Sequence, residues 1–307
     1  MSFSSELRSE LCKRVDRATH CRIAMLAGIV TLDGKMKEEA EQRFLSIRVE
    51  KDEVVDVTKR LLQMVFGIEE QELDILPRAQ EGARIRIRDE EQVSRIMQTL
   101  KLSELDGRLD ADDIVLARGC CSAAFLRGTF LAAGSVSNPE VSYQMEIVTD
   151  RDTVTRQVLT ALSGFGTTGH VTERKYSQVV YIKDADSISE TLGQLGAANA
   201  MMELENVRIL KSIRNNINRE VNCDTANITK TANAAVRQIE EIRRLESTVG
   251  LESLPASLQE LARIRLEHPD LSLKELGERM DPPIGKSGVN HRLRKISELA
   301  AHPESLR

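Results

Sequence analysis

A run of ten residues near the end of the chain is rich in side chains that could bind nucleic acid. The run from Lys286 to Lys295 reads K-S-G-V-N-H-R-L-R-K, and most of its polar groups donate hydrogen bonds. Phosphates and base edges accept such bonds. Val289, Leu293 and Ile296 recur at helical spacing on one side, so the segment is predicted to form a helix with a cationic polar face. The major groove of duplex DNA accepts a helix of this kind.

The candidate contacts of this helix fall into two classes. Helical phase predicts base-edge contacts, to within one or two positions, for Lys286, Ser287, Asn290, His291 and Arg294. Phosphate contacts are predicted for Arg292 and Lys295, and the segment just before the helix adds Ser272 and Lys274 to the same candidate surface.

A helix-turn-helix is the element that would position these side chains. Ser272, with Glu275 three positions later, forms a capping box that predicts a helix start, and Pro282 and Pro283 stop that helix from continuing. The same pattern is also typical of surface helices that bind no nucleic acid. Charge favours DNA, because residues 206–307 contain 17 Lys and Arg against 14 Asp and Glu, whereas residues 1–205 contain 26 against 34.

The rest of the C-terminal region is predicted to be helical. A helix is expected over 228–245, and a second capping box, S-L-Q-E at 257–260, is expected to begin another. Asn222, Asn227 and Thr229 lie around the expected start of the first of these helices, where they would cap it or hold a phosphate. Together with the two motif helices, this indicates a bundle of about four helices.

Composition excludes several classes of protein. The 307 residues suffice for two or three domains, and 41% hydrophobic with 30% charged residues is typical of a globular protein. Trp is absent and aromatic residues make up 3%, which argues against a stacking platform for single-stranded nucleic acid. No apolar run is long enough to span a membrane, and the N-terminus lacks a signal-peptide pattern. We therefore expect a cytoplasmic protein with no membrane partner.

The five cysteines show no pattern typical of a disulfide framework or a zinc site. Their number is odd, and two of them are adjacent, but none forms a C-x-x-C pair. We predict that they serve as small buried apolar residues and that the protein needs no metal or other cofactor. The cysteines are Cys12, Cys21, Cys120, Cys121 and Cys223.

An internal repeat occupies the N-terminal two thirds of the chain. Residues 21–34 read C-R-I-A-M-L-A-G-I-V-T-L-D-G, and residues 121–134 read C-S-A-A-F-L-R-G-T-F-L-A-A-G. After each motif the pattern predicts strand, helix, strand and helix. The strands are expected at 42–49 and 83–88 in the first copy and at 141–148 and 178–183 in the second, with a further strand possible within 35–47 and 167–180. The duplication suggests a pseudo-twofold domain in which the two motif helices meet.

Small residues explain how those helices would meet. Ala27, Gly28 and Gly128 remove side chains from one face, which allows two backbones to approach closely. Residues 26–34, L-A-G-I-V-T-L-D-G, resemble the LAGLIDADG motif of homing endonucleases, and residues 126–134 resemble a degraded second copy. In that family the acid before the last glycine of each copy holds a divalent metal. The resemblance assigns this position to Asp33 in the first copy and to Ala133 in the second, so half of the metal site is missing.

A degenerate LAGLIDADG repeat followed by a helix-turn-helix resembles the WhiA family, DNA-binding regulators of sporulation and cell division in Gram-positive bacteria. The likeness extends over the whole chain and is most specific at N-R-E-V-N-C-D-T-A-N-I-T-K-T (218–231) and S-G-V-N-H-R-L-R-K (287–295). It implies a non-enzymatic transcription regulator associated with the nucleoid and bound to double-stranded promoter DNA. Members of the family in some lineages act with an iron-sulfur protein of the WhiB type, and the acidic balance of residues 1–205 suits RNA polymerase as another possible partner.

The predicted fold is α+β, a pseudo-twofold endonuclease-like domain followed by an all-α helix-turn-helix bundle. The expected parts are a first repeat (1–110), a second repeat (111–205), a linker (206–219) and the DNA-binding domain (220–307). Two alternatives for the N-terminal domain stay open. It could be a residual metal-dependent nicking enzyme that uses Asp33, or an acidic platform for a protein partner. Arg84, Arg86 and Arg88 share one face of a predicted strand and would either contact phosphate or lie solvated.

Overall fold

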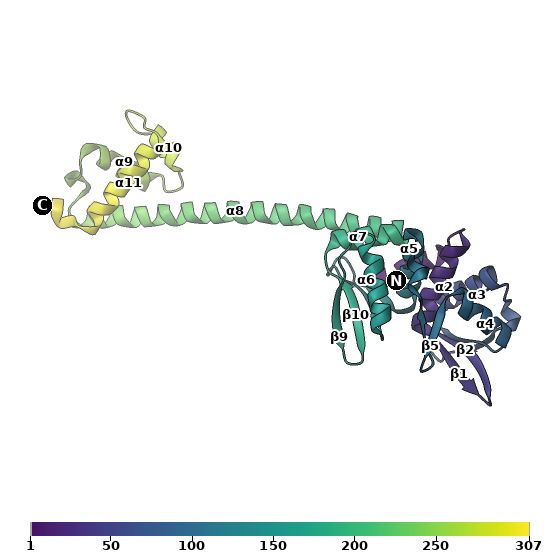
Figure 1. Cartoon of the computed structure of the whole chain (residues 1–307). Helices are drawn as coiled ribbons and strands as arrows, with labels where there is room; N and C mark the ends of the chain where they lie inside the picture. The colour runs from purple at the N-terminus through teal and green to yellow at the C-terminus, as the bar shows by residue number, and fades with distance from the viewer. Residues whose placement is uncertain (1, 307) are drawn as a thin grey trace. The chain divides into compact units, whose positions relative to one another are not determined.

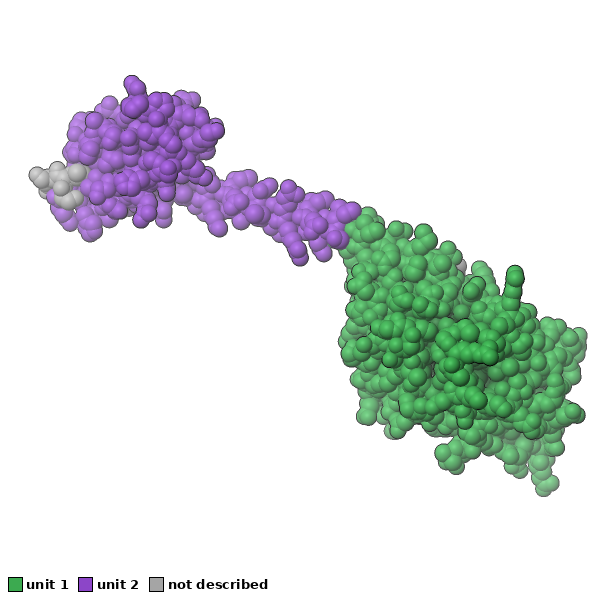
Figure 2. Space-filling view, turned by 45° about the horizontal axis from the view of Figure 1, so that its top comes forward, with its two compact units in different colours: residues 1–211 green, residues 212–307 purple. Residues whose placement is uncertain are grey.

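The computed structural model describes residues 2–306, which form two compact units, 1–211 and 212–307 (Figure 2). The boundary between the units falls within one helix, α8 (Ala198–Thr248). No Gly or Pro interrupts the sequence of this helix, and Gly250, with φ of +80°, follows its end. Residues 206–219, predicted as a linker, are therefore helical, and a helix does not begin at Ile228.

Unit 1 begins with α1 (Phe3–Lys13) and then repeats one order of elements twice. The first copy consists of α2 (Thr19–Asp33), β1 (Gly34–Glu39), β2 (Gln42–Val49), α3 (Asp52–Phe66), β3 (Asp74–Pro77), β4 (Ala83–Ile87) and α4 (Glu90–Thr99). The second consists of α5 (Gly119–Ala133), β7 (Gly134–Val136), β8 (Met145–Thr149), α6 (Asp152–Ser163), β9 (His170–Arg174), β10 (Ser177–Ile182) and α7 (Ala185–Leu195). Each copy is thus α-β-β-α-β-β-α. The additional strand considered in each half is present as β1 in the first copy and β9 in the second, whereas β3 and β7 were not predicted.

The two sheets repeat the same strand order. The first contains β3-β4-β2-β1 and the second β9-β10-β8-β7, with every neighbouring pair antiparallel. A hairpin between the copies, β5 (Leu102–Leu105) and β6 (Arg108–Ala111), extends the first sheet and was not predicted. The strand predicted over 141–148 begins later, because residues 138–142 form a hydrogen-bonded turn that leaves Val141 80% exposed.

The seam between the copies is formed by α2 and α5, and the small residues act there as predicted. A Cβ on Gly28 would lie 2.4 Å from the carbonyl oxygen of Phe125, and one on Gly128 would lie 2.1 Å from that of Met25. Ala27 is fully buried between them. Because real Cβ atoms do not approach backbone this closely, the two helices meet at a distance that glycine alone permits.

Unit 2 has a hydrophobic core of its own. It contains the C-terminal part of α8, η3 (Leu251–Ser253), α9 (Ala256–Glu267), α10 (Leu273–Glu278), α11 (Lys286–Ala301) and η4 (Pro303–Leu306), the last three helical elements being yellow in Figure 1. Ile242, Leu261, Leu276 and Val289 bring α8, α9, α10 and α11 together in this core. The capping box predicted at 257–260 is wrong, because α9 begins at Ala256 after Pro255 and has no side-chain cap. None of the helices in residues 2–306 has both the length and the apolar content needed to cross a membrane.

Candidate nucleic-acid interface

The helix-turn-helix forms from the signals seen in the sequence. Ser272 Oγ accepts a hydrogen bond from the Glu275 backbone N–H (3.4 Å), and the Glu275 carboxylate accepts one from the Ser272 N–H (2.8 Å). These bonds with Ser272 lower the pKa of Glu275, because they favour its charged form. The helix α10 ends at Glu278, before the prolines, and α11 begins at Lys286. Val289, Leu293 and Ile296 are buried, which fixes the polar face of α11 outward.

A groove of about 550 Å³ lies beside this motif, within unit 2. Four elements line it: the C-terminal part of α8, Arg265 of α9, the start of α10 and one side of α11. Five exposed cations line the groove, namely Lys230 and Arg237 from α8, Lys274 from α10, and Lys286 and Arg294 from α11, and the buried Arg265 of α9 is a sixth. A concave surface with this charge suits the sugar-phosphate backbone of a nucleic acid.

The cations of the groove are largely free to bind an external anion. In the part of the chain that the structure describes, no carboxylate lies within ion-pair distance of Lys230, Lys286 or Arg294. Arg237 is 3.9 Å from Glu241 and Lys274 is 3.8 Å from Glu278, and both cations are exposed. Such long, exposed pairs contribute little, so a phosphate would displace them at small cost.

Five of the nine predicted contact residues line this groove. They are Ser272, Lys274, Lys286, Asn290 and Arg294. Ser287 and His291 lie one turn apart on the adjoining exposed face of α11, where they stay predicted base contacts. Lys295 lies 3.3 Å from Glu298 on the same helix. Arg292 is half-buried and points to α9, with Ser257 O at 3.4 Å and the Met280 sulfur at 3.5 Å. Its predicted phosphate contact is the weakest of the set.

The contribution of α8 to the groove was missed in the sequence. Lys230 and Arg237 are seven positions apart, which places them on one helical face, and this spacing was the available signal. Asn222, Asn227 and Thr229, predicted to cap a helix start, are instead exposed inside the continuous helix.

Arg265 forms the inner wall of the groove. It is 2% exposed, and its guanidinium donates to Gln238 Oε1 (2.9 and 3.1 Å) and to the carbonyl of Leu271 (2.6 Å). Burial lowers the pKa of Arg265, because the charged form loses hydration there. These bonds join α9 to α8 and to Leu271, two residues before α10, so Arg265 holds the elements of the groove together.

The degenerate acid position lies in unit 1, where Asp33 ends α2. It borders a cavity of about 320 Å³ that Arg48, Glu50, Arg84 and Asp150 also line. Burial, and then the nearby charge of Glu50, raise the pKa of Asp33 well above its usual value. Its Oδ2 atom is buried and has no hydrogen-bond partner within residues 2–306. A carboxylate held at such a site favours its neutral form.

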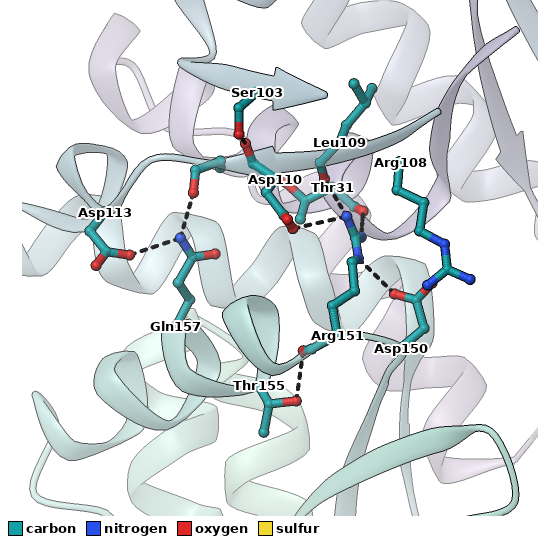
Figure 3. Close-up of polar contacts among 11 residues, drawn as sticks. Thr31, Ser103, Arg108, Leu109, Asp110, Asp113, Asp150, Arg151, Thr155 and Gln157 are labelled. Carbon is teal, nitrogen blue, oxygen red and sulfur yellow. Dashed lines mark hydrogen bonds and ion pairs between the residues drawn. The ribbon is translucent and has the colours of Figure 1, made fainter. Parts of the chain in front are cut away.

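The second copy has no acid at the motif position, although its Asp150 lines the same cavity. Ala133 occupies the position that corresponds to Asp33, as the sequence shows. Close by, the seam between the copies is held by a cation: Arg151 donates to Asp110 (2.9 Å), Asp150 (3.0 Å) and the carbonyls of Leu109 and Thr31 (Figure 3). A Mg²⁺ ion needs several oxygen ligands, usually including two carboxylates or substrate phosphates. The residues at this position do not fit a metal site of the endonuclease kind.

The arginine strand face is paired within the protein. Arg86 and Arg88 lie near Glu39 and Asp74, and both guanidinium groups stack on the Phe44 ring. Arg84 borders the Asp33 cavity. Arg86 and Arg88 are thus already paired with acids and an aromatic ring. This pairing weakens the predicted role of the three arginines as phosphate contacts.

The prediction that all five cysteines are buried is wrong for two of them. Cys120 and Cys223 are exposed, whereas Cys12, Cys21 and Cys121 are buried. Two of the buried cysteines and Cys120 meet His20 at the start of the α2–α5 seam. Sequence spacing alone hid this group because its halves are about one hundred residues apart, but the repeat itself aligns His20-Cys21 with Cys120-Cys121.

Comparison with known proteins gives matches over the whole chain. The family descriptions "WhiA C-terminal HTH domain" and "WhiA LAGLIDADG-like domain" match residues 217–300 and 122–214. A "probable cell division protein WhiA" from Heliobacterium modesticaldum is 41% identical over 313 residues, which cover 98% of this chain and 96% of the relative. One of the same name from Lachnospira eligens is 42% identical over 309 residues, with the same coverage.

Two solved structures share the fold. The crystal structure of full-length DUF199/WhiA from T. maritima is 22% identical, covers 98% of both chains and gives a TM-score of 0.59. The N-terminal LAGLIDADG domain of DUF199/WhiA is 18% identical, covers 64% of this chain and 90% of that one, and gives a TM-score of 0.50. At these identities the likeness shows that the fold is the same.

Proposed function

Because the chain belongs to the WhiA family, we propose that it is a sequence-specific transcription regulator of genes for cell division, chromosome segregation or sporulation. The observation that carries the proposal is the groove of five exposed cations beside α10 and α11. Duplex promoter DNA would place one strand's phosphates in this groove and its base edges against Ser287, Asn290, His291 and Arg294. Such a protein would act on the nucleoid.

Unit 1 is proposed to have no catalytic role. It keeps the fold of an endonuclease repeat but has one acid, Asp33, where that chemistry needs two. Its residues 1–205 carry an excess of acids, which suits contact with a protein better than contact with DNA. RNA polymerase and a WhiB-type iron-sulfur protein remain the predicted partners.

A DNA titration tests the regulatory function. We expect the full chain and a fragment of residues 212–307 to select the same sequence from genomic DNA, since unit 2 has its own core and carries the groove. With four or five phosphate contacts, the log affinity should fall with log salt at a slope of about −4. If the fragment binds DNA without selecting a sequence, sequence readout requires the full chain. If the log affinity does not change with log salt, binding through the groove is contradicted.

Substitution of Asp33 separates a non-catalytic unit 1 from a nicking enzyme. If Asp33 has no catalytic role, its substitution should affect only stability. Its folded-state pKa is raised, so its favourable contribution to stability is complete below the unfolded pKa, about 3.9, and is lost as the pH rises through the folded value. We therefore expect Asp33→Asn to melt at a higher temperature than the natural chain at pH 7 and at nearly the same temperature below about pH 4.

Calorimetry across this pH range, with the exposed Asp106→Asn as control, measures the effect. A catalytic Asp33 would instead show itself in Mg²⁺-dependent plasmid breaks by the natural chain that Asp33→Asn abolishes. We expect the plasmid to stay intact with both proteins.

A further inference from the structure

Four side chains with metal-binding atoms converge at the N-terminal ends of the two seam helices. His20 and Cys21 belong to the first turn of α2, and Cys120 and Cys121 to the first turn of α5. The Nδ1 atom of His20 lies 3.2 Å from the Cys121 sulfur and 3.3 Å from the Cys21 sulfur. All four ligand atoms lie within 4.8 Å of one another, and no other group of this kind occurs among residues 2–306.

The spacing of these atoms matches what a single ion requires. A zinc ion binds cysteine sulfur at about 2.3 Å and histidine nitrogen at about 2.0 Å, so two ligands of one ion are at most about 4.6 Å apart. Tetrahedral coordination brings them to roughly 3.5–3.8 Å. The contacts of His20, at 3.2 and 3.3 Å, are slightly shorter than this range, and the longest separation in the group, within 4.8 Å, is slightly longer, so the four atoms are already close to the spacing of one ion.

We propose that His20, Cys21, Cys120 and Cys121 bind one zinc ion that joins the two repeats. Three sulfurs and one imidazole nitrogen form a donor set typical of structural zinc sites, and four protein ligands leave no open position for catalysis. This site lies in unit 1 and does not rest on the DNA binding proposed for unit 2.

The pseudo-twofold symmetry explains how such a site arises without a C-x-x-C motif. His20 corresponds to Cys120 and Cys21 to Cys121, so each copy supplies two adjacent ligands from the same helical turn. Glycine contacts farther along α2 and α5 fix the two turns relative to one another. Each repeat alone holds half a site, and the seam assembles the whole.

The surroundings allow an ion to enter. Burial raises the pKa of the Cys21 and Cys121 thiols, so zinc would displace their protons as it binds. Cys21 and Cys121 are buried, His20 is half-buried and Cys120 is exposed, which gives the ion a path from solvent.

Thiol oxidation is the competing chemistry for this group. A disulfide would join two of the three cysteine sulfurs. The third sulfur and the His20 imidazole nitrogen would then take no part in the bond. A single ion uses all four ligand atoms, and it also accounts for the inward position of His20 Nδ1. Zinc bound here would link the N-terminal ends of α2 and α5 and stabilise unit 1 against unfolding.

Metal analysis of the full-length chain tests the proposal directly. The protein would be purified under reducing conditions from zinc-supplemented cells, and its metal content measured by plasma mass spectrometry. We expect roughly one zinc per chain, and substitution by Co²⁺ should give the visible absorption of a tetrahedral thiolate site. The exposed-ligand variant Cys120→Ser and the buried Cys121→Ser should each lower the zinc content several-fold, while Cys223→Ser on α8 should leave it unchanged.

Two results would overturn the proposal. One is a chain whose five thiols all react with a thiol reagent, yet which contains no zinc and gives no tetrahedral spectrum with Co²⁺. The other is an intact mass lower by two hydrogens with no metal present, which would identify a disulfide. Chelation provides a measurement independent of the variants. Removal of zinc should lower the melting temperature of the natural chain and of Cys223→Ser, but not that of Cys120→Ser.

Discussion

Replacing Asn290 and Arg294 together with alanine is expected to weaken binding to the selected DNA sequence by roughly 30-fold or more. The two side chains lie one turn apart on α11, where both are exposed and border the groove. Asparagine reads adenine and arginine reads guanine through paired hydrogen bonds, each worth about 1–3 kcal/mol. Because neither change disturbs the buried side of α11, the loss should come from contacts with DNA.

The pattern of the loss distinguishes base reading from charge. Fluorescence anisotropy titrations against the selected sequence and an unrelated sequence, at two salt concentrations, would give the specificity ratio directly. We expect that ratio to fall with the double variant. Arg263→Ala, which removes an equal charge from an exposed site on α9, should leave it unchanged. Equal weakening on both sequences would assign Arg294 and Asn290 to the phosphate backbone.

Local signals in the sequence were sufficient for most elements of the fold. The strand at 42–49 was predicted with its observed bounds because alternating apolar residues and flanking turns define it. The helix starts at Asp52, Asp152 and Leu273 followed from acids and a capping box. The hairpin of β5 and β6 was not predicted, because each strand has only four residues, too few to show a clear alternation of apolar and polar side chains.

The α8 helix shows a second kind of failure. Residues 212–233 are all exposed, so no buried stripe marks them as helical, and the sequence read as a linker followed by a new helix start. Continuity instead depends on residues that tolerate helical geometry and on the absence of Gly and Pro between Ala198 and Thr248. The period of apolar residues reveals a helix only where one face of it is buried, so it gives no signal for a helix that is exposed on all sides.

The candidate site combined local and distant information. Five groove residues could be predicted because they sit on α10 and α11, whose order is local. Lys230 and Arg237 enter the groove through the packing of α8 against the motif, which depends on contacts such as those of Arg265. The ligands at His20 and Cys120 likewise meet only when two helices from distant parts of the chain pair. Residue spacing places Lys230 and Arg237 on one helical face and aligns the two ligand pairs, but it does not show what either group packs against.

Substituting alanine for Gly28 is expected to lower the free energy of unfolding of unit 1 by about 2–3 kcal/mol. In an open helix the same change would stabilise by up to about 1 kcal/mol, because glycine is a poor helix former. The clash decides the sign here, since the added Cβ would lie 2.4 Å from Phe125 O and 3.0 Å from Thr129 N. Gly128→Ala, at 2.1 Å from Met25 O, should cost at least as much.

A matched control lies on the same pair of helices. A Cβ added to Gly119, at the start of α5, would have no neighbouring atom within 4 Å, so Gly119→Ala should be neutral or slightly stabilising. Denaturant unfolding of the full chain, followed by circular dichroism, would separate the loss in unit 1 from unit 2, whose core is independent. DNA binding should survive in Gly28→Ala. If Gly28→Ala proved as stable as the natural chain, the close approach of α2 and α5 would be contradicted. The pairing of these helices that brings His20 and Cys21 to Cys120 and Cys121 would then lose its support.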